Sequence, residues 1–163
     1  MKNQNPFILF LFFAIAIYFL KKNSDIASNQ LHPNKNYLLV VERGAFHNDC
    51  FELTPETITF YPNVNSEYSI AKYNQFSRKQ LKPENMLSFF DKMESLGFWE
   101  LNDDYKNESS CTSQLKVTLF VDGKSKTIRC DDFERDCPDI IQQIEKKVIE
   151  IEGNNLERIY LPG

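Results

Sequence analysis

The sequence predicts an α+β fold, in which an antiparallel sheet carries two helices packed on one face and a membrane helix precedes the domain. Two stretches place their apolar residues at helical spacing, several shorter segments alternate apolar and polar residues around turn signals, and the N-terminus carries a continuous apolar run. Hairpins imply antiparallel pairing. Two helices that are apolar on one side only need one face of a sheet to cover.

The apolar run at the N-terminus is Phe7–Leu20, fourteen residues without a charge. As a helix it would be about 21 Å long, shorter than the hydrocarbon core of about 30 Å, as is typical of a signal-peptide apolar region. No pair of small residues comes after it at the spacing that a signal peptidase needs. We therefore expect residues 1–22 to form an uncleaved signal anchor that contacts the membrane through residues 7–20. The alternative is a buried N-terminal helix of the fold.

The charges that flank the run do not fix its orientation, because Lys2 and the amino terminus balance Lys21 and Lys22. An N-terminal anchor of this kind exports the chain on its C-terminal side, so we expect the domain to lie outside the cytoplasm, in the periplasm or at the cell surface. Residues 23–36 are polar and without pattern, which is typical of a linker. The globular domain then covers residues 37–163.

The first half of the domain reads as strands. Tyr37–Gly44 is β-rich and apolar at its start, which predicts a strand buried on both faces. Phe51–Leu53 and Thr57–Tyr61 flank Thr54-Pro55-Glu56, a pattern typical of a hairpin with the proline at its bend. We expect a further strand over Glu67–Phe76.

The stretch Pro83–Leu101 predicts a core helix with an apolar plug at its end. Pro83 suits the first helical turn, and Gly97 suits the left-handed residue just past the last one. Trp99 stands just beyond Gly97, between Phe98 and Leu101, so we expect it to be buried where the helix meets the sheet. The apolar residues with one-face spacing are Met86, Phe89, Phe90, Met93 and Leu96.

The second half predicts a hairpin and a last helix. Leu115–Val121 alternates apolar and polar residues up to Asp122-Gly123, a strong hairpin turn, and the returning arm places Ile128 and Cys130 on the face of Val117. The last helix is expected over Pro138–Glu152, with Gly153 past its end. Lys106–Ser113 reads as a loop, and Asn154–Gly163 is compatible with a last edge strand.

Three motifs in this half resemble a family of small exported or membrane-anchored bacterial domains of unknown function. They are L-G-F-W-E-L-N-D-D-Y at Leu96–Tyr105, D-G-K-S-K-T-I at Asp122–Ile128 and P-D-I-I-Q-Q-I-E at Pro138–Glu145. The likeness covers about Gln80–Ile149. It implies an exported α+β domain and no established activity.

Charge and motif content bear on the classes of function. Residues 37–163 contain 15 Lys and Arg and 22 Asp and Glu, so their net charge is 15 − 22 = −7. An acidic domain without a basic stripe repels phosphate backbones, so we expect no nucleic-acid partner. No Gly-rich phosphate loop, G-x-S-x-G or H-E-x-x-H motif occurs, and the acidic run Asp131–Asp139 lacks the alternation of an EF-hand loop. We therefore assign no catalytic residue, cofactor or metal site.

The four cysteines are compatible with two structural disulfides in an exported domain, with one, or with free thiols. Cys130 and Cys137 bracket a loop of six residues and are the pair that we favour, although Cys111 could compete for Cys137. Three pairings of four cysteines exist, and the spacing does not choose among them. Cys50 is the fourth cysteine and a possible partner in a second disulfide.

Two functions remain as hypotheses. The first is a non-enzymatic binding module at the membrane surface, with a protein partner. The second is an uncharacterised metal-assisted hydrolase around His47, in which Cys50 and nearby carboxylates would complete a zinc site. The candidate contact residues of the binding module are the aromatics Tyr61, Tyr68, Tyr73 and Phe76, for each of which a place in the core is the more common fate.

Overall fold

The computed structural model describes residues 35–44, 47–63, 65, 70–108 and 113–159. The chain divides into two compact units at the boundary between Lys35 and Asn36, and all but one of the described residues belong to the second unit. No helix in this described part is long and apolar enough to cross a membrane. The expected span Phe7–Leu20 lies outside the described residues.

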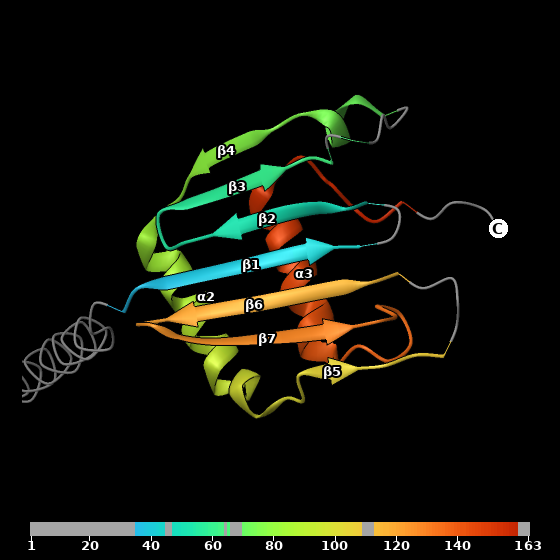
Figure 1. Cartoon of the computed structure of the whole chain (residues 1–163). Coiled ribbons are helices and arrows are strands. Elements are labelled where there is room, and N and C mark those ends of the chain that lie inside the picture. Colours follow the sequence, from blue (N-terminus) through green and yellow to red (C-terminus); the bar gives the residue numbers. More distant parts are fainter. Residues whose placement is uncertain (1–34, 45–46, 64, 66–69, 109–112, 160–163) are drawn as a thin grey trace, which may run out of the picture. The chain divides into compact units, whose positions relative to one another are not determined.

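The domain is built on one seven-stranded sheet with the strand order β4-β3-β2-β1-β6-β7-β5 (Figure 1). All neighbouring strands are antiparallel except β5 and β7, which are parallel. The strands are β1 Tyr37–Arg43, β2 Asp49–Leu53, β3 Thr57–Tyr61, β4 Ser77–Gln80, β5 Asp104–Tyr105, β6 Leu115–Val121 and β7 Lys124–Cys130.

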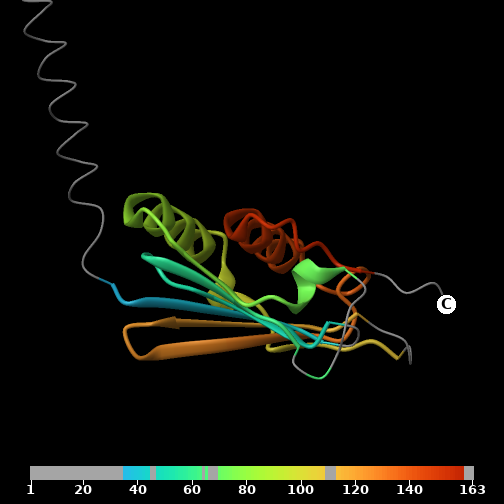
Figure 2. The same cartoon turned by 90° about the horizontal axis from the view of Figure 1, so that it is seen from above.

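Both long helices lie on the same side of this sheet, as Figure 2 shows. They are α2, Pro83–Ser95, and α3, Asp139–Glu152. Two short 3-10 helices, η1 (Ala71–Asn74) and η2 (Phe98–Glu100), precede β4 and follow α2. The prediction of an α+β fold with an antiparallel sheet and two helices on one face is confirmed for the described residues. The opposite face of the sheet carries no helix of this part of the chain.

In strand β1 the side chains on the helix side of the sheet are buried, and those on the other side are partly exposed. Its residues alternate between buried and partly exposed, with Leu39, Val41 and Arg43 on the helix side and Val40 and Glu42 on the other. The expectation that this strand is buried on both faces is therefore wrong, because the helices cover only one face.

The second hairpin forms as predicted. Asp122 and Gly123 both have positive φ, 49° and 83°, as a two-residue hairpin loop requires. The register pairs Val117 with Ile128 and Leu115 with Cys130, which brings all four side chains into the core.

The end of α2 differs from the expectation. Gly97 is left-handed, with φ 88°, as predicted, but Leu96 is 54% exposed and Trp99 only partly buried, whereas Phe98 is fully buried. Successive residues of the short helix η2 point in different directions, so only one of the two aromatic side chains enters the core. The Trp99 indole N–H donates to Glu94 Oε2 at 3.2 Å, and the Lys124 ammonium lies 3.7 Å from the ring centroid.

Three other segments differ as well. Within the described part of the strand expected over Glu67–Phe76, Ala71–Asn74 forms a 3-10 helix, and the edge strand begins only at Ser77. The expected last strand is absent from the described part of the tail, which ends at Ile159. The short strand β5, Asp104–Tyr105, was not expected.

Candidate functional site

A buried ion pair joins β1 and β2 on the helix side of the sheet. Arg43 and Asp49 are paired in the register of these strands. Arg43 Nε donates to Asp49 Oδ1 at 2.7 Å and Nη2 to Oδ2 at 2.5 Å, and both side chains are fully buried. This bidentate geometry is the strong form of an arginine–carboxylate contact.

A second buried pair lies beside the first. Arg158 Nε lies 3.0 Å from each carboxylate oxygen of Glu145 on α3, and its Nη1 donates to Ser113 Oγ at 2.7 Å. The Arg158 guanidinium also lies 4.2 Å from the centroid of the Phe133 ring. Arg43 Nη1 is 3.9 Å from Glu145 Oε1, so the two pairs form one cluster of two positive and two negative charges.

The cluster fastens the C-terminal tail to the domain. Arg43 Nη1 donates to the carbonyl oxygen of Leu156 at 2.6 Å, and the Tyr73 hydroxyl donates to that of Glu157 at 2.7 Å. The amide N–H of Ile159 donates to His47 Nε2 at 2.9 Å. Because Leu156 is itself fully buried, the tail completes the core.

His47, around which the sequence suggested a metal site, belongs to this arrangement. Its side chain is buried, Nε2 accepts the amide of Ile159, and Nδ1 lies 3.4 Å from Asp49 Oδ2. Burial would raise the pKa of Asp49, but hydrogen bonds from His47 and Arg43 hold it below its ordinary value. The described residues contain no group of three or more His, Cys, Asp or Glu side chains that could hold a metal ion.

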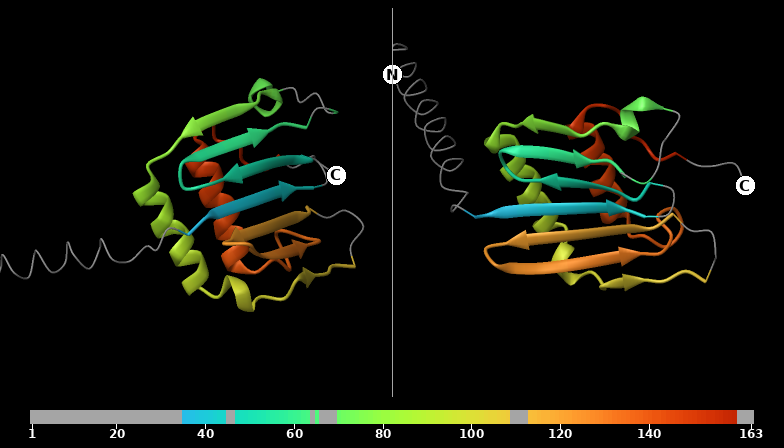
Figure 3. Two further views of the ribbon diagram at one scale, coloured as in Figure 1. Left: turned by 60° about the vertical axis from the view of Figure 1, so that its left-hand side comes forward. Right: turned by 45° about the horizontal axis from the view of Figure 1, so that its top comes forward.

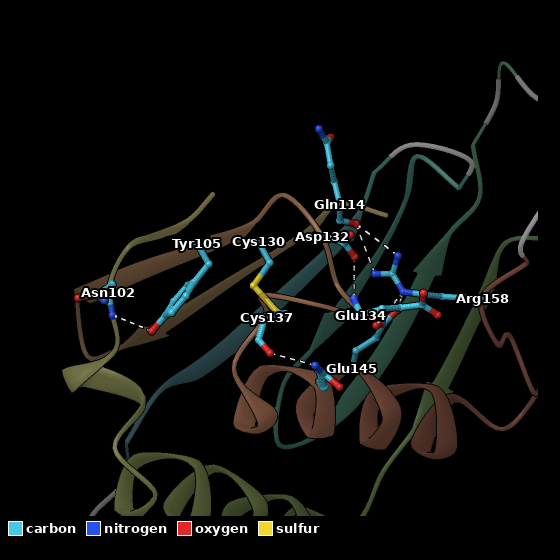
Figure 4. The surroundings of a disulfide bond; sticks show 10 residues. Asn102, Tyr105, Gln114, Cys130, Asp132, Glu134, Cys137, Glu145 and Arg158 are labelled. Atoms are coloured by element: carbon cyan, nitrogen blue, oxygen red, sulfur yellow. Dashed lines mark hydrogen bonds and ion pairs between the residues drawn. A yellow bond between two sulfur atoms is a disulfide. The ribbon is translucent and has the colours of Figure 1, made fainter. Parts of the chain in front are cut away.

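The cysteines separate into two environments. Cys130 and Cys137 form a disulfide with their Cα atoms 5.3 Å apart, as the loop between them suggested (Figure 4). Cys50 is a free thiol on the uncovered side of the sheet. Its partial burial, and to a lesser extent the negative charges of Glu42 and Glu52, raise its pKa to about 12. It is therefore protonated at neutral pH and a poor nucleophile. Cys111 lies outside the described residues.

The uncovered face of the sheet has an apolar and hydroxyl-bearing centre. In the register, Leu38 of β1 stands opposite Phe120 of β6, and Val40 stands opposite Thr118, whose hydroxyl lies 3.0 Å from that of Thr127 on β7. Phe120 is 39% exposed. These side chains lie on the face that neither helix covers.

Charges of both signs lie beside this centre at one end of the face. Lys116 Nζ lies 2.6 Å from Glu42 Oε2, and Arg129 Nη1 lies 3.5 Å from Asp104 Oδ1. All four of these groups are exposed by two fifths or more of their side-chain surface. They form a polar rim along one end of the uncovered face.

The aromatic residues proposed as contacts are only partly brought together. Tyr61 and Phe76 lie side by side on the uncovered face, 41% and 59% exposed, with ring centroids 5.6 Å apart in an edge-to-face arrangement. The Tyr61 hydroxyl donates to Glu52 Oε2 at 3.1 Å. This hydrogen bond is the main reason why the pKa of Tyr61 lies above its ordinary value. Tyr73 is buried under the C-terminal tail. Tyr68 lies outside the described residues.

Sequence reasoning did not predict the cluster of Arg43, Asp49, Glu145 and Arg158. One signal was present: Arg43 follows Tyr37, Leu39 and Val41 at the spacing of a single strand face, so alternation places its charge in the core. The partners come from α3 and the tail, distant in sequence, and no local pattern links them.

Comparison with known protein families, curated proteins and solved structures gives no match for this chain.

Proposed function

We propose that this chain is a membrane-anchored, extracytoplasmic and non-enzymatic module that binds a protein through the uncovered face of its sheet. One observation carries the proposal. The uncovered face combines an apolar centre, with Leu38, Val40 and Phe120, and a charged rim that includes Lys116 and Arg129. An apolar centre with a polar rim is the usual anatomy of a protein interface.

The charge pattern favours a protein as the partner. The rim alternates acidic and basic side chains, such as Glu42 beside Lys116 and Asp104 beside Arg129. A protein surface can complement such a mixed pattern residue by residue. A phosphate backbone cannot, and the net charge of −4 of the whole chain repels it.

The state of the candidate reactive groups supports a binding role. The Cys50 thiol stays protonated, because burial and the neighbouring carboxylates raise its pKa to about 12. His47 accepts the backbone hydrogen bond of Ile159 at Nε2 and faces Asp49 of β2 at Nδ1, so both ring nitrogens face groups of the folded domain.

Two features support a place outside the cytoplasm. The disulfide Cys130–Cys137 is of a kind that persists in oxidising compartments. The apolar run Phe7–Leu20 is long enough to enter the secretory route as a signal or an anchor.

Site-specific photocrosslinking in native membranes tests the binding face. The full chain carries a photoreactive phenylalanine analogue either at Phe120, on the uncovered face, or at Leu96, an exposed apolar position at the end of α2. We expect a discrete protein adduct from position 120 and none from position 96. The adduct from position 120 should disappear when Val40→Lys is introduced beside it.

The substitution at Val40 separates a specific contact from chance capture, because it places a charge in the centre of the face. An adduct from position 96 but not from position 120 would contradict the proposal. So would an adduct from position 120 that is unchanged by Val40→Lys in a chain that retains its thermal stability.

A further inference from the structure

The strand β4 is the edge strand of the sheet on the side of β3. It stands last in the strand order and pairs only with β3 among the described strands, and Figure 3 shows it (green) at the border of the sheet in both views. The amide of Leu81, just past β4, donates to the carbonyl oxygen of Glu56 at 2.8 Å. In an antiparallel ladder every second residue bonds to the same neighbour. The backbone groups of Arg78 and Gln80 therefore point away from the sheet.

The side chains beside this edge form a small patch on the uncovered face, which we call the edge patch: Tyr61, Phe76 and Arg78. Arg78 is paired with Thr59 in the register, two residues from Tyr61 on β3, and so shares its face. Phe76 has the largest exposed fraction of any large hydrophobic side chain in the described part of the chain. Tyrosine and arginine dominate the energetics of protein interfaces.

The edge is locally basic in an acidic protein. Between residues 70 and 82 the chain carries Lys72, Arg78, Lys79 and Lys82 and no Asp or Glu, whereas the whole chain has a net charge of −4. Positive charges beside an open strand favour a negatively charged partner strand. Pairing of β4 with a second copy of itself would oppose like charges and is disfavoured for the same reason.

Charged edge strands also occur as a protection against pairing. Lys79, within β4, is a charged residue of this kind: it lies on the helix side of the sheet, where its Nζ donates to the carbonyl oxygen of Ile151 at 3.1 Å. One observation beside β4 does not fit a protective role. Phe76, an exposed aromatic residue directly before the strand, promotes pairing rather than prevents it.

From this geometry we propose that β4 accepts an extended acidic segment of the partner protein as an added strand. The inference rests on the proposed function and names the chemistry of the partner. Backbone bonds to Arg78 and Gln80 hold the segment, as in other cases of strand addition. Residues two apart on a strand share a face, so the segment places an apolar residue against Phe76 and Tyr61 and a carboxylate, two positions along, against Arg78.

The test uses the full chain in detergent micelles and a fluorescein-labelled peptide with the sequence Thr-Val-Thr-Phe-Thr-Glu-Thr, whose binding is followed by anisotropy. A second peptide carries Lys in place of Glu. We expect the Glu peptide to bind and Arg78→Glu to weaken it about tenfold, equivalent to 1.4 kcal/mol. The Lys peptide should bind Arg78→Glu better than it binds the unaltered chain.

Two further variants complete the test. Gln80→Pro removes an amide that points away from the sheet, so it should abolish binding while the ladder with β3 remains. Lys146→Glu makes the same change of charge on an exposed residue of α3 and should leave binding unchanged. Should Gln80→Pro fail to fold, the charge exchange at Arg78 remains decisive.

The inference is overturned if the Glu peptide does not bind, if both peptides bind the unaltered chain equally, or if a folded Gln80→Pro variant binds normally. The crosslink from Phe120 does not depend on the peptide. If the Glu peptide does not bind but the crosslink from Phe120 still forms, the added strand is disproved and the proposed function stands. Loss of the crosslink alone removes the proposed binding face.

Discussion

At the scale of single residues, Arg43 occupies a strand position that alternation reserves for an apolar side chain. The charge is tolerated there because the guanidinium is hydrogen-bonded. Nε and Nη2 donate to the carboxylate of Asp49, and Nη1 donates to the carbonyl oxygen of Leu156. Removing one partner of a buried ion pair is strongly destabilising because it leaves an uncompensated buried charge, whereas replacing both partners by well-packed apolar residues is often neutral. The cluster is therefore sensitive to the removal of any one member.

We expect Asp49→Asn to lower the free energy of unfolding by about 3–5 kcal/mol at pH 7, because it removes the bidentate partner of the buried Arg43 and leaves it only the more distant carboxylate of Glu145, which Arg158 also uses. Unfolding of the full chain in denaturant, followed by the fluorescence of Trp99, the single tryptophan, measures this. Asp103→Asn removes an exposed carboxylate 3.2 Å from Lys126 Nζ; it is the control and should cost less than about 1 kcal/mol.

The same pair gives a pH dependence. In the folded state the pKa of Asp49 lies below its ordinary value of 3.8, so the unfolded chain binds this proton more readily. The stabilisation from Asp49 is complete above that ordinary value and is lost as the pH falls through the folded pKa. We expect this part of the acid destabilisation to be absent in Asp49→Asn. An identical slope of unfolding free energy against pH in both chains, below the pH of about 4 at which an unfolded aspartate titrates, would contradict the assignment.

The adjacent aromatic residues Phe98 and Trp99 differ in how much they stabilise the fold. We expect Phe98→Ala to cost about 3–5 kcal/mol, since Phe98 is fully buried. Trp99→Ala should cost about 1–2 kcal/mol, from partial burial, the contact with Lys124 and the hydrogen bond to Glu94. Circular dichroism measures both, because the second variant lacks the fluorescent reporter. Equal losses would mean that Trp99 is packed as deeply as Phe98.

At the scale of elements, the disulfide Cys130–Cys137 links the end of β7 to the residue before the N-cap of α3. Together with the tail contacts of Arg43 and Arg158, it holds α3 against the sheet at both ends. Closing so short a loop stabilises mainly by restricting the unfolded chain.

We expect the double variant Cys130→Ala/Cys137→Ala to lower the free energy of unfolding by roughly 2–3 kcal/mol, as loop closure over this separation predicts. A reducing agent should shift the unfolding of the unaltered chain in the same direction and leave the double variant unchanged. Cys50→Ala, at the free thiol, is the control: it should keep the stability of the unaltered chain and respond to the reducing agent in the same way. A double variant that is as stable as the unaltered chain would contradict a structural role for the bond.

The elements that the sequence predicts well are those with a local cause. Gly97 and Gly153 end their helices in the left-handed conformation, and Asp122-Gly123 turns the hairpin, because these conformations depend on neighbouring residues only. The strand β5 and the helix η1 were missed because their contacts are made with distant segments. Of the candidate site, the exposure of Tyr61 and Phe76 was not predictable, since alternation alone does not say which face of a sheet is covered.

At the scale of the whole molecule, the two faces of the sheet differ in what covers them. The helices, the disulfide and the tail contacts lie on one side and bury the apolar face of the sheet. The uncovered face holds the apolar centre, the rim and the edge patch. Substitutions on the uncovered face, such as Val40→Lys or Arg78→Glu, are therefore expected to change binding with little effect on unfolding.

The proposed anchor gives a prediction about the mature chain. No pair of small residues stands at the spacing of a cleavage site after Leu20, so we expect Phe7–Leu20 to remain on the protein. N-terminal sequencing of the chain extracted from native membranes should begin at Met1 or at the residue after it. A mature form that begins within residues 23–36 would show that the run is a cleaved signal peptide.

The orientation of the chain is the last prediction, and it tests the compartment without relying on the disulfide. The flanking charges of Lys2, Lys21 and Lys22 are balanced, so only the exporting character of an N-terminal apolar run favours an external domain. In a chain that lacks the thiols of Cys50 and Cys111, a cysteine introduced at Asn34 should react with a membrane-impermeant maleimide in intact cells. A cysteine introduced at Asn3 should react only after the cells are lysed. The reverse pattern would place the domain in the cytoplasm and remove the extracytoplasmic part of the proposed function, whereas the binding face and its crosslinking test would stand as they are.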